Sequence, residues 1–221
     1  MSQFRWIIMS SFLMLLFHFT AGKYSTSTVR AGDEVTLSCE HVIDDQDKCD
    51  STSWTFGGLR GTVMLLERGE ISKEAEDKSD RLSVTEKCSL VIKKVTEDDA
   101  GSYTCRQNRS GEQKAVHLSV VTITEQKNDD TVTLNCSVLG YYSGCRHSVK
   151  WLYEGYKTDV KTTQHSCSAT ATFTTSHLNQ KSKYNELLKC EVTEEYSREV
   201  KLFPFIPPQS SGEKPGENMM I

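Results

Sequence analysis

The sequence lacks the patterns that assign a chain to several common classes of protein. Its formal net charge is −4, and it has no basic stripe with interleaved aromatic residues, which argues against nucleic-acid binding. It has no Cys-x-x-Cys pair, which argues against a structural zinc site. Beyond the N-terminal segment it has no apolar run of about 18 residues, so it predicts no transmembrane helix.

The polar residues form no recognisable catalytic or metal-binding pattern. The six histidines are scattered, and none stands in a known frame beside a serine or cysteine nucleophile. The acidic segment Asp44–Asp47 lacks the glycine and the distal glutamate of a calcium-binding loop. We therefore expect no enzymatic activity, no cofactor and no metal site.

An apolar segment near the N-terminus predicts a secretory signal. Arg5 precedes the mostly apolar run Ile7–Phe19, and the small residues Thr20–Gly22 follow it. The run is too short to span a bilayer comfortably, so we expect a signal peptide at residues 1–22, with an uncleaved anchor as the alternative. Secretion would place the cysteines in an oxidising compartment, where disulfides persist.

The eight cysteines fall into two similar groups, each around a tryptophan. The first group is Cys39, Cys49, Cys88 and Cys105 around Trp54, and the second is Cys136, Cys145, Cys167 and Cys190 around Trp151. Trp54 follows Cys39 at the same distance as Trp151 follows Cys136. A Cys…Trp…Cys pattern that repeats after about 100 residues is the spacing of tandem immunoglobulin-type sandwiches.

Alternation of polar and apolar residues predicts β-strands in both halves, and therefore an all-β fold. The segments with this pattern are Glu34–Cys39, Ser53–Phe56, Ser89–Ile92, Ala115–Val121, Thr131–Cys136, Ser148–Tyr153 and Ser168–Thr174.

The first half resembles a V-set immunoglobulin domain. The signature residues are Trp54, Asp99, Gly101, Tyr103 and Cys105, the last four in an Asp-x-Gly-x-Tyr-x-Cys motif. The resemblance implies that the Tyr103 hydroxyl bonds back to upstream backbone and that Arg81 pairs with Asp99. Segment 112–118 lacks the Phe/Trp-Gly-x-Gly bulge of antigen-receptor variable domains, which favours an innate or accessory receptor module.

The second half resembles a C-type immunoglobulin domain. Leu188 stands where the corner tyrosine would be, and fewer residues separate Trp151 from Cys190 than separate Trp54 from Cys105. The shorter span leaves no room for the extra edge strands of a V-type domain. We therefore expect a V-type domain at 23–121, a C-type domain at 122–204, and a disordered Pro/Ser/Gly/Glu-rich stalk at 205–221.

The resemblance also implies a disulfide pairing. The pairs across the sheets would be Cys39–Cys105 and Cys136–Cys190, which leaves Cys49–Cys88 and Cys145–Cys167. Four cysteines allow three connectivities, but in a V-type sandwich the two remaining positions lie at the same end, within the distance that a disulfide can bridge. The additional bridges would stabilise a secreted domain, or shape the loop before the tryptophan strand for a ligand.

These features point to an extracellular recognition protein, of the kind found in the ectodomains of immune cell-surface receptors. We expect a protein ligand, on another cell or in the extracellular space; the alternatives are a secreted decoy or effector, and a homophilic adhesion protein. A membrane anchor is expected only if the chain continues beyond Ile221. Asn108 and Asn135 begin glycosylation sequences. Candidate ligand-binding residues are Arg60, Glu67, Arg68, Arg106, Gln107, Asn108 and Arg109.

Overall fold

The structure is a computed structural model that describes residues 24–39, 49–58, 61–107, 111, 113–141, 144–154, 160–174 and 187–206. The expected signal peptide and residues 207–221 of the expected stalk lie outside these ranges. The described chain is mostly β, which confirms the predicted fold class. It divides into two compact units between Ser119 and Val120, called here the first and second halves.

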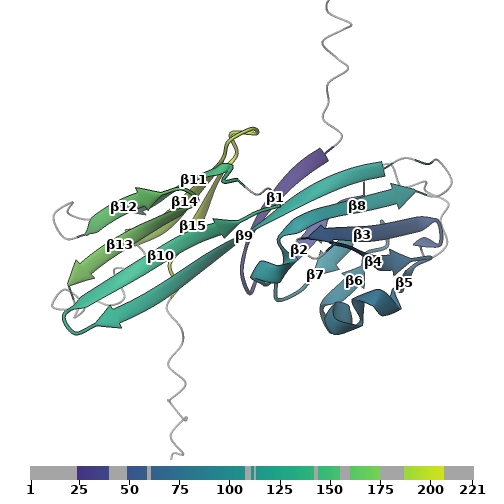
Figure 1. Cartoon of the computed structure of the whole chain (residues 1–221), viewed down its shortest axis with the longest axis horizontal. Coiled ribbons are helices and arrows are strands. Elements are labelled where there is room, and N and C mark those ends of the chain that lie inside the picture. The colour runs from purple at the N-terminus through teal and green to yellow at the C-terminus, as the bar shows by residue number, and fades with distance from the viewer. Residues whose placement is uncertain are drawn as a thin grey trace, which may run out of the picture. The chain divides into compact units, whose positions relative to one another are not determined.

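The first half contains two sheets (Figure 1). Its strands are β1 (Tyr24–Arg30), β2 (Val35–Leu37), β3 (Thr52–Gly58), β4 (Gly61–Glu67), β5 (Glu70–Ile71), β6 (Leu82–Val84), β7 (Leu90–Ile92), β8 (Gly101–Gln107) and the start of β9 (Gln113–Asn128). One sheet has the order β9-β8-β3-β4-β5, with β1 beside β9, and the other has the order β2-β7-β6. Two 3₁₀ segments, η2 (Lys73–Arg81) and η3 (Glu97–Asp99), lie in the connections before β6 and β8.

The core of the first half follows from the alternation in its strands. In β8, Tyr103 and Cys105 are buried while their neighbours Ser102 and Thr104 are partly exposed. Successive side chains in a strand point to opposite faces of the sheet, so one face supplies the core and the other faces solvent. The largest fully buried side chains of this half include Trp54, Tyr103, Leu37, Leu66, Leu90 and Leu118.

The second half also contains two sheets (Figure 1). After the end of β9, its strands are β10 (Thr131–Leu139), β11 (His147–Tyr153), β12 (Lys161–His165), β13 (Ser168–Thr174), β14 (Leu188–Glu194) and β15 (Val200–Pro204). One sheet has the order β12-β13-β10-β9 and the other has the order β11-β14-β15.

An apolar cluster forms the core of the described part of the second half. Strand β10 alternates strictly, with Val132, Leu134 and Cys136 buried and the intervening residues partly exposed. Strands β11 and β14 supply Val149, Trp151, Leu188, Cys190 and Val192 to the same cluster. This half therefore has its own hydrophobic core, as an independent domain requires.

Candidate functional site

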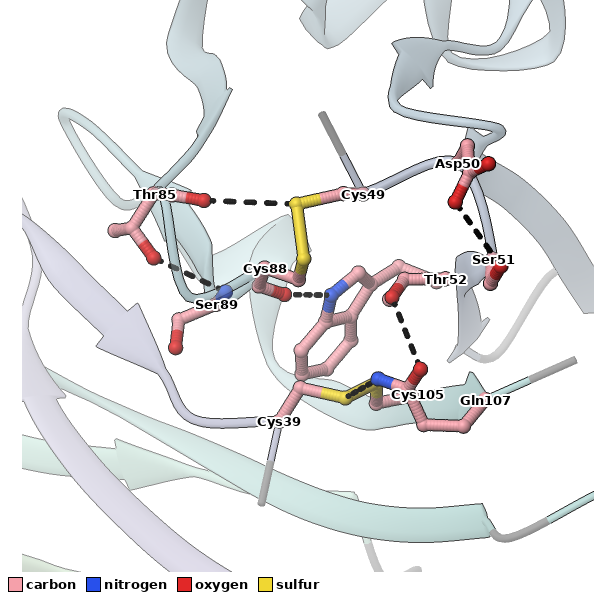
Figure 2. Close-up of a disulfide and its surroundings, with 11 residues drawn as sticks. Cys39, Cys49, Asp50, Ser51, Thr52, Thr85, Cys88, Ser89, Cys105 and Gln107 are labelled. Atoms are coloured by element: carbon pink, nitrogen blue, oxygen red, sulfur yellow. Dashed lines mark hydrogen bonds between the residues drawn. A yellow bond between two sulfur atoms is a disulfide. The ribbon is translucent and has the colours of Figure 1, made fainter. Parts of the chain in front are cut away.

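The structure has four disulfides, two in each half, as the sequence predicts. In the first half, the Cα atoms of Cys39 and Cys105 lie 5.7 Å apart, and those of Cys49 and Cys88 lie 5.5 Å apart. Figure 2 shows these two bridges near each other. The fully buried Trp54 adjoins both bridges, because its indole Nε1–H donates to the Cys88 carbonyl oxygen at 2.9 Å and Trp54 pairs with Cys105 between β3 and β8.

Gln107 is part of this buried framework. Its side-chain amide nitrogen donates to the Cys39 sulfur at 3.2 Å, and its side-chain oxygen accepts from the Thr52 hydroxyl at 3.3 Å (Figure 2). Only 2% of Gln107 is exposed. The expectation that Gln107 contacts a ligand is therefore corrected: Gln107 shares the inward face of β8 with Tyr103 and Cys105.

The second disulfide of the first half anchors a tight turn between β6 and β7. The Cys88 N–H donates to the Thr85 carbonyl oxygen at 2.9 Å, and the Ser89 N–H donates to the Thr85 hydroxyl at 3.1 Å. Cys88 has a φ of 57°, in the left-handed region that side chains with a Cβ rarely adopt. The bridge therefore ties the segment that precedes β3 to a turn with a fixed, strained conformation (Figure 2).

The second half repeats this arrangement. The Cα atoms of Cys136 and Cys190 lie 6.4 Å apart, and those of Cys145 and Cys167 lie 5.4 Å apart. The Trp151 indole donates to the Ala169 carbonyl oxygen at 2.9 Å, two residues beyond Cys167. Cys167 lies in the turn between β12 and β13 with a φ of 58°, close to the value at Cys88.

A cluster centred on Asp99 in the first half has the charged pair that the V-set resemblance implies. Both carboxylate oxygens of Asp99 accept from the Arg81 guanidinium, at 2.8 and 3.2 Å, and Lys78 Nζ donates to one of them at 2.8 Å. The backbone N–H of Thr96 donates to Asp99 Oδ2 at 2.9 Å. The Tyr103 hydroxyl donates to the Asp99 carbonyl oxygen at 2.7 Å. These five residues are called the Asp99 cluster below.

The electrostatics of the Asp99 cluster follow from burial and pairing. Burial of Asp99, which is 1% exposed, by itself raises the pKa of the carboxyl, but hydrogen bonds from Arg81 and Lys78 outweigh it and lower the pKa to about 2. The hydrogen bond to Asp99 raises the pKa of Arg81. Burial raises the pKa of Tyr103, so its hydroxyl stays a donor. Asp99 thus stays ionised above about pH 2 and is paired with Arg81 and Lys78.

Gly101 has a packing role beside this cluster. A Cβ at Gly101 would overlap the Phe56 ring and lie 2.8 Å from the Gly57 carbonyl oxygen. The Phe56 ring also lies 4.9 Å from the Tyr103 ring, and Lys78 Nζ lies 4.8 Å from its centroid. Glycine is therefore needed at position 101 for β3 and β8 to approach each other closely.

The outer face of β4, β3, β8 and β9 in the first half carries small side chains at its centre. The register places four residues in a central row: Met64, Thr55, Thr104 and Ala115. The next row contains Glu67, Ser53, Arg106 and Gln113. At the other side of the central row, the His117 ring on β9 stacks on the Tyr24 ring at 5.1 Å. The central row thus has Glu67 and Arg106 on one side and the stacked rings of His117 and Tyr24 on the other.

The predicted ligand-binding residues are distributed unevenly over this region. Glu67 and Arg106 lie in one row of the outer face, and both are exposed. Arg68 is exposed in the turn after β4. Arg60, Asn108 and Arg109 lie outside the described residues.

Sequence reasoning missed Thr52 and Lys78, which support this site, and assigned Gln107 to a ligand instead of to the buried framework. Thr52 and Gln107 could have been found by continuing the period-two alternation from Cys105 and Trp54. Lys78 lies in the strongly charged segment η2, where no periodic signal distinguishes the lysine that reaches Asp99.

Comparison with known families identifies the first half. Residues 23–121 match the family model of the immunoglobulin V-set domain. The chain contains a V-set domain. No curated protein matches the sequence. The V-set domain and the four disulfides together point to an extracellular protein.

The described part of the chain contains no helix with the length and apolar character needed to cross a membrane. Within the same ranges, no three His, Cys, Asp or Glu residues are grouped so that they could hold a metal ion.

Proposed function

We propose that this chain is an extracellular recognition protein that binds a protein ligand through the outer face of its V-set domain. Its architecture would be that of an immune cell-surface receptor ectodomain, with a V-type domain followed by a C-type domain. V-set domains are typically non-catalytic, which is consistent with binding as the function.

The strand arrangement of the second half supports the C-type assignment. Constant-type immunoglobulin sandwiches have four strands in one sheet and three in the other, in the order ABED and CFG. With β9 as strand A, the order β12-β13-β10-β9 corresponds to DEBA, and β11-β14-β15 corresponds to CFG. The first half has the two further strands β4 and β5 beside β3, as a V-type sheet does.

The observation that carries the binding proposal is the composition of the outer face of β4, β3, β8 and β9. Thr55, Thr104 and Ala115 are partly exposed and small, so no long side chain stands between a partner and the centre of the face at these positions. Arg106 and Glu67 in the next row would supply charged contacts that select the partner and its orientation. A protein surface with a protruding apolar side chain and complementary charges fits such a face.

The experiment is a binding screen with the secreted chain. Fluorescent tetramers of the chain would be applied to a panel of cells and of arrayed extracellular proteins. We expect the tetramers to bind a partner. Thr104→Arg should abolish this binding, because a long side chain would fill the centre of the face, and Arg106→Glu should lower the affinity at least tenfold. Ser83→Arg on β6 and Lys87→Glu in the β6–β7 turn are matched controls in the other sheet, and both should bind normally.

Two results would contradict the proposal. Binding that is unaffected by Thr104→Arg but lost in Ser83→Arg would place the site on the other sheet. Aggregation of beads coated with this chain alone, without any other protein, would support a homophilic adhesion protein instead.

A further inference from the structure

The outer face of the sheet β9-β10-β13 in the second half is neutral. The register places Asn135 of β10 between Thr124 of β9 and Thr170 of β13, and Thr163 of β12 follows Thr170 in the same row. The hydroxyls of Thr163 and Thr170 are hydrogen-bonded to each other. All four side chains in this row are polar and uncharged.

The two neighbouring rows have the same character across β9, β10 and β13. On one side, Thr133 lies between Gln126 and Thr172, and on the other, Ser137 lies between Thr122 and Ser168. Across β9, β10 and β13 the three rows contain only Thr, Ser, Asn and Gln, and charge-bearing side chains appear only on the edge strand β12, where Lys161 and His165 extend the two outer rows. An exposed sheet face ordinarily carries interspersed charges of both signs.

The other sheet of this half has an ordinary charged surface. Lys150 on β11 pairs with Glu191 on β14 at 2.9 Å, and Lys189 on β14 pairs with Glu154 at 2.9 Å. The absence of charge is therefore specific to the outer face of β9, β10 and β13 among the described strands of this half.

Asn135 at the centre of the neutral face begins the sequence Asn135-Cys136-Ser137. Strand alternation places the side chains of Asn135 and Ser137 on the outer face, where both are partly exposed. Cys136 between them points inward and is fully buried in its disulfide with Cys190. The acceptor amide and the hydroxyl that glycosylation requires are thus on the same side of the strand.

We infer that Asn135 carries an N-linked glycan and that this glycan covers the neutral face. Hydroxyl and amide side chains can exchange hydrogen bonds with sugar hydroxyls without removing any charged group from water. The glycan also supplies the solubility that charged side chains supply on other surfaces. The inference rests on the extracellular location in the proposed function, because glycosylation takes place in the secretory pathway.

The modification is a transfer from a lipid-linked oligosaccharide diphosphate, catalysed by an oligosaccharyltransferase of the host cell. A bond forms between the Asn135 side-chain nitrogen and the anomeric carbon of the first sugar. The bond from that carbon to the diphosphate breaks, and the lipid diphosphate leaves with the electron pair. The amide nitrogen loses one proton to a base. No oxidant or reductant is needed.

The first test is occupancy in the full chain secreted from a eukaryotic cell line. Enzymatic release of N-glycans in heavy-oxygen water would convert a modified asparagine to labelled aspartate, detected in peptides. We expect the label at Asn135, loss of one glycan from the intact mass in Asn135→Gln and in Ser137→Ala, and retention in Ser137→Thr. Asn108→Gln is the matched control, because Asn108 begins the second glycosylation sequence and its loss should leave Asn135 modified.

The second test asks where the glycan lies. The methyl NMR signals of Thr124, Thr133 and Thr170 would be compared before and after the glycan is trimmed to one sugar. We expect these signals to shift and the signal of Thr104 in the V-set domain to stay unchanged. Absence of shifts would overturn the claim that the glycan covers this face.

The two levels of failure can be separated. A chain that is secreted with unmodified Asn135 would overturn this inference and leave the proposed function intact. A chain that never reaches the medium, with Asn108 and Asn135 both unmodified, would overturn the extracellular location itself.

Discussion

The two halves of this chain share a covalent framework but stabilise the strand of the closing cysteine differently. Each half has one disulfide across its sheets, a second disulfide at a turn, and a tryptophan whose indole donates to backbone near that turn. In the V-set domain, Tyr103 binds backbone and Asp99 binds Arg81 and Lys78. In the second half, Leu188 occupies the position of Tyr103 and is fully buried in the apolar core.

The difference shows that the disulfides and the Asp99 cluster are separable parts of the architecture. A buried leucine needs no polar partner and contributes about 1.5–3 kcal/mol by burial alone. A buried tyrosine needs a hydrogen-bond partner for its hydroxyl, and the buried Asp99 carboxylate needs cations to offset the cost of its desolvation. The V-set domain therefore has a buried polar network beside its closing cysteine, whereas the second half has apolar packing at the same position.

The largest effect is expected from Asp99→Ala. The substitution leaves Arg81 partly buried without its partner, so the V-set domain should lose about 3–5 kcal/mol of stability. The second half should be unaffected. Hydrogen exchange of peptides from each half would measure both effects in one experiment. As a control, Glu154→Ala removes a more exposed pair with Lys189 and should cost no more than about 1 kcal/mol. Equal losses in both halves would refute their independence.

Removal of the second disulfide should destabilise each half by about 3–4 kcal/mol. The Cys49–Cys88 pair encloses 39 residues and the Cys145–Cys167 pair 22, so the loss should be larger in the V-set domain by about 0.5 kcal/mol. Alanine at both positions of each pair retains the Cβ atoms, so the left-handed turns keep their strain. Urea unfolding of the two double variants provides the comparison. A greater loss from the shorter loop would show that native contacts, rather than loop closure, determine the effect.

Acid should weaken the V-set domain more than the second half. The pKa of Asp99 is lowered from 3.8 to about 2 in the folded protein, so its contribution is fully present above about pH 4 and disappears as the pH falls through about 2. The shift corresponds to about 2 kcal/mol. Urea unfolding at pH 5 and pH 2, with hydrogen exchange to assign each transition, would measure it. Asp99→Asn should remove this loss of stability at low pH. If the loss persists in that variant, other carboxylates cause it.

The smallest effect is expected from Tyr103→Phe. It removes the hydrogen bond to the Asp99 carbonyl oxygen and leaves that oxygen unpaired, at a cost of about 1–2 kcal/mol. Tyr196→Phe is the control, because Tyr196 is an exposed tyrosine of the second half and its substitution should change stability by less than about 0.5 kcal/mol. Thermal unfolding of both variants is sufficient. A neutral Tyr103→Phe would mean that water replaces the hydroxyl.

The framework of both halves could be predicted because cysteine, tryptophan and strand alternation leave strong signals in the sequence. The all-β fold and two disulfides per half followed from these signals. The pairing of Arg81 with Asp99 was accessible only through the V-set resemblance, because no local pattern relates residues in separate loops. The V-set resemblance implied no partner role for Lys78, and the contact between Lys78 and Asp99 depends on the path of η2.

The placement of individual surface residues was harder to predict. Gln107 was expected to contact a ligand, yet its position two residues after Cys105 determines an inward side chain. The neutral face around Asn135 also emerges only from register, because it is built from β9, β10 and β13, and β13 is separated from the other two strands in the sequence.

Disulfide mapping without reduction, after removal of N-glycans, is the most direct test that each half is a self-contained domain with two disulfides of its own. Trypsin can cleave between all four cysteines of the first half, whereas no lysine or arginine separates Cys136 from Cys145, and chymotryptic cleavage after Tyr141 is needed there. We predict four linked pairs, Cys39–Cys105, Cys49–Cys88, Cys136–Cys190 and Cys145–Cys167. A linked peptide that joins a cysteine of the first half to one of the second would contradict two self-contained domains.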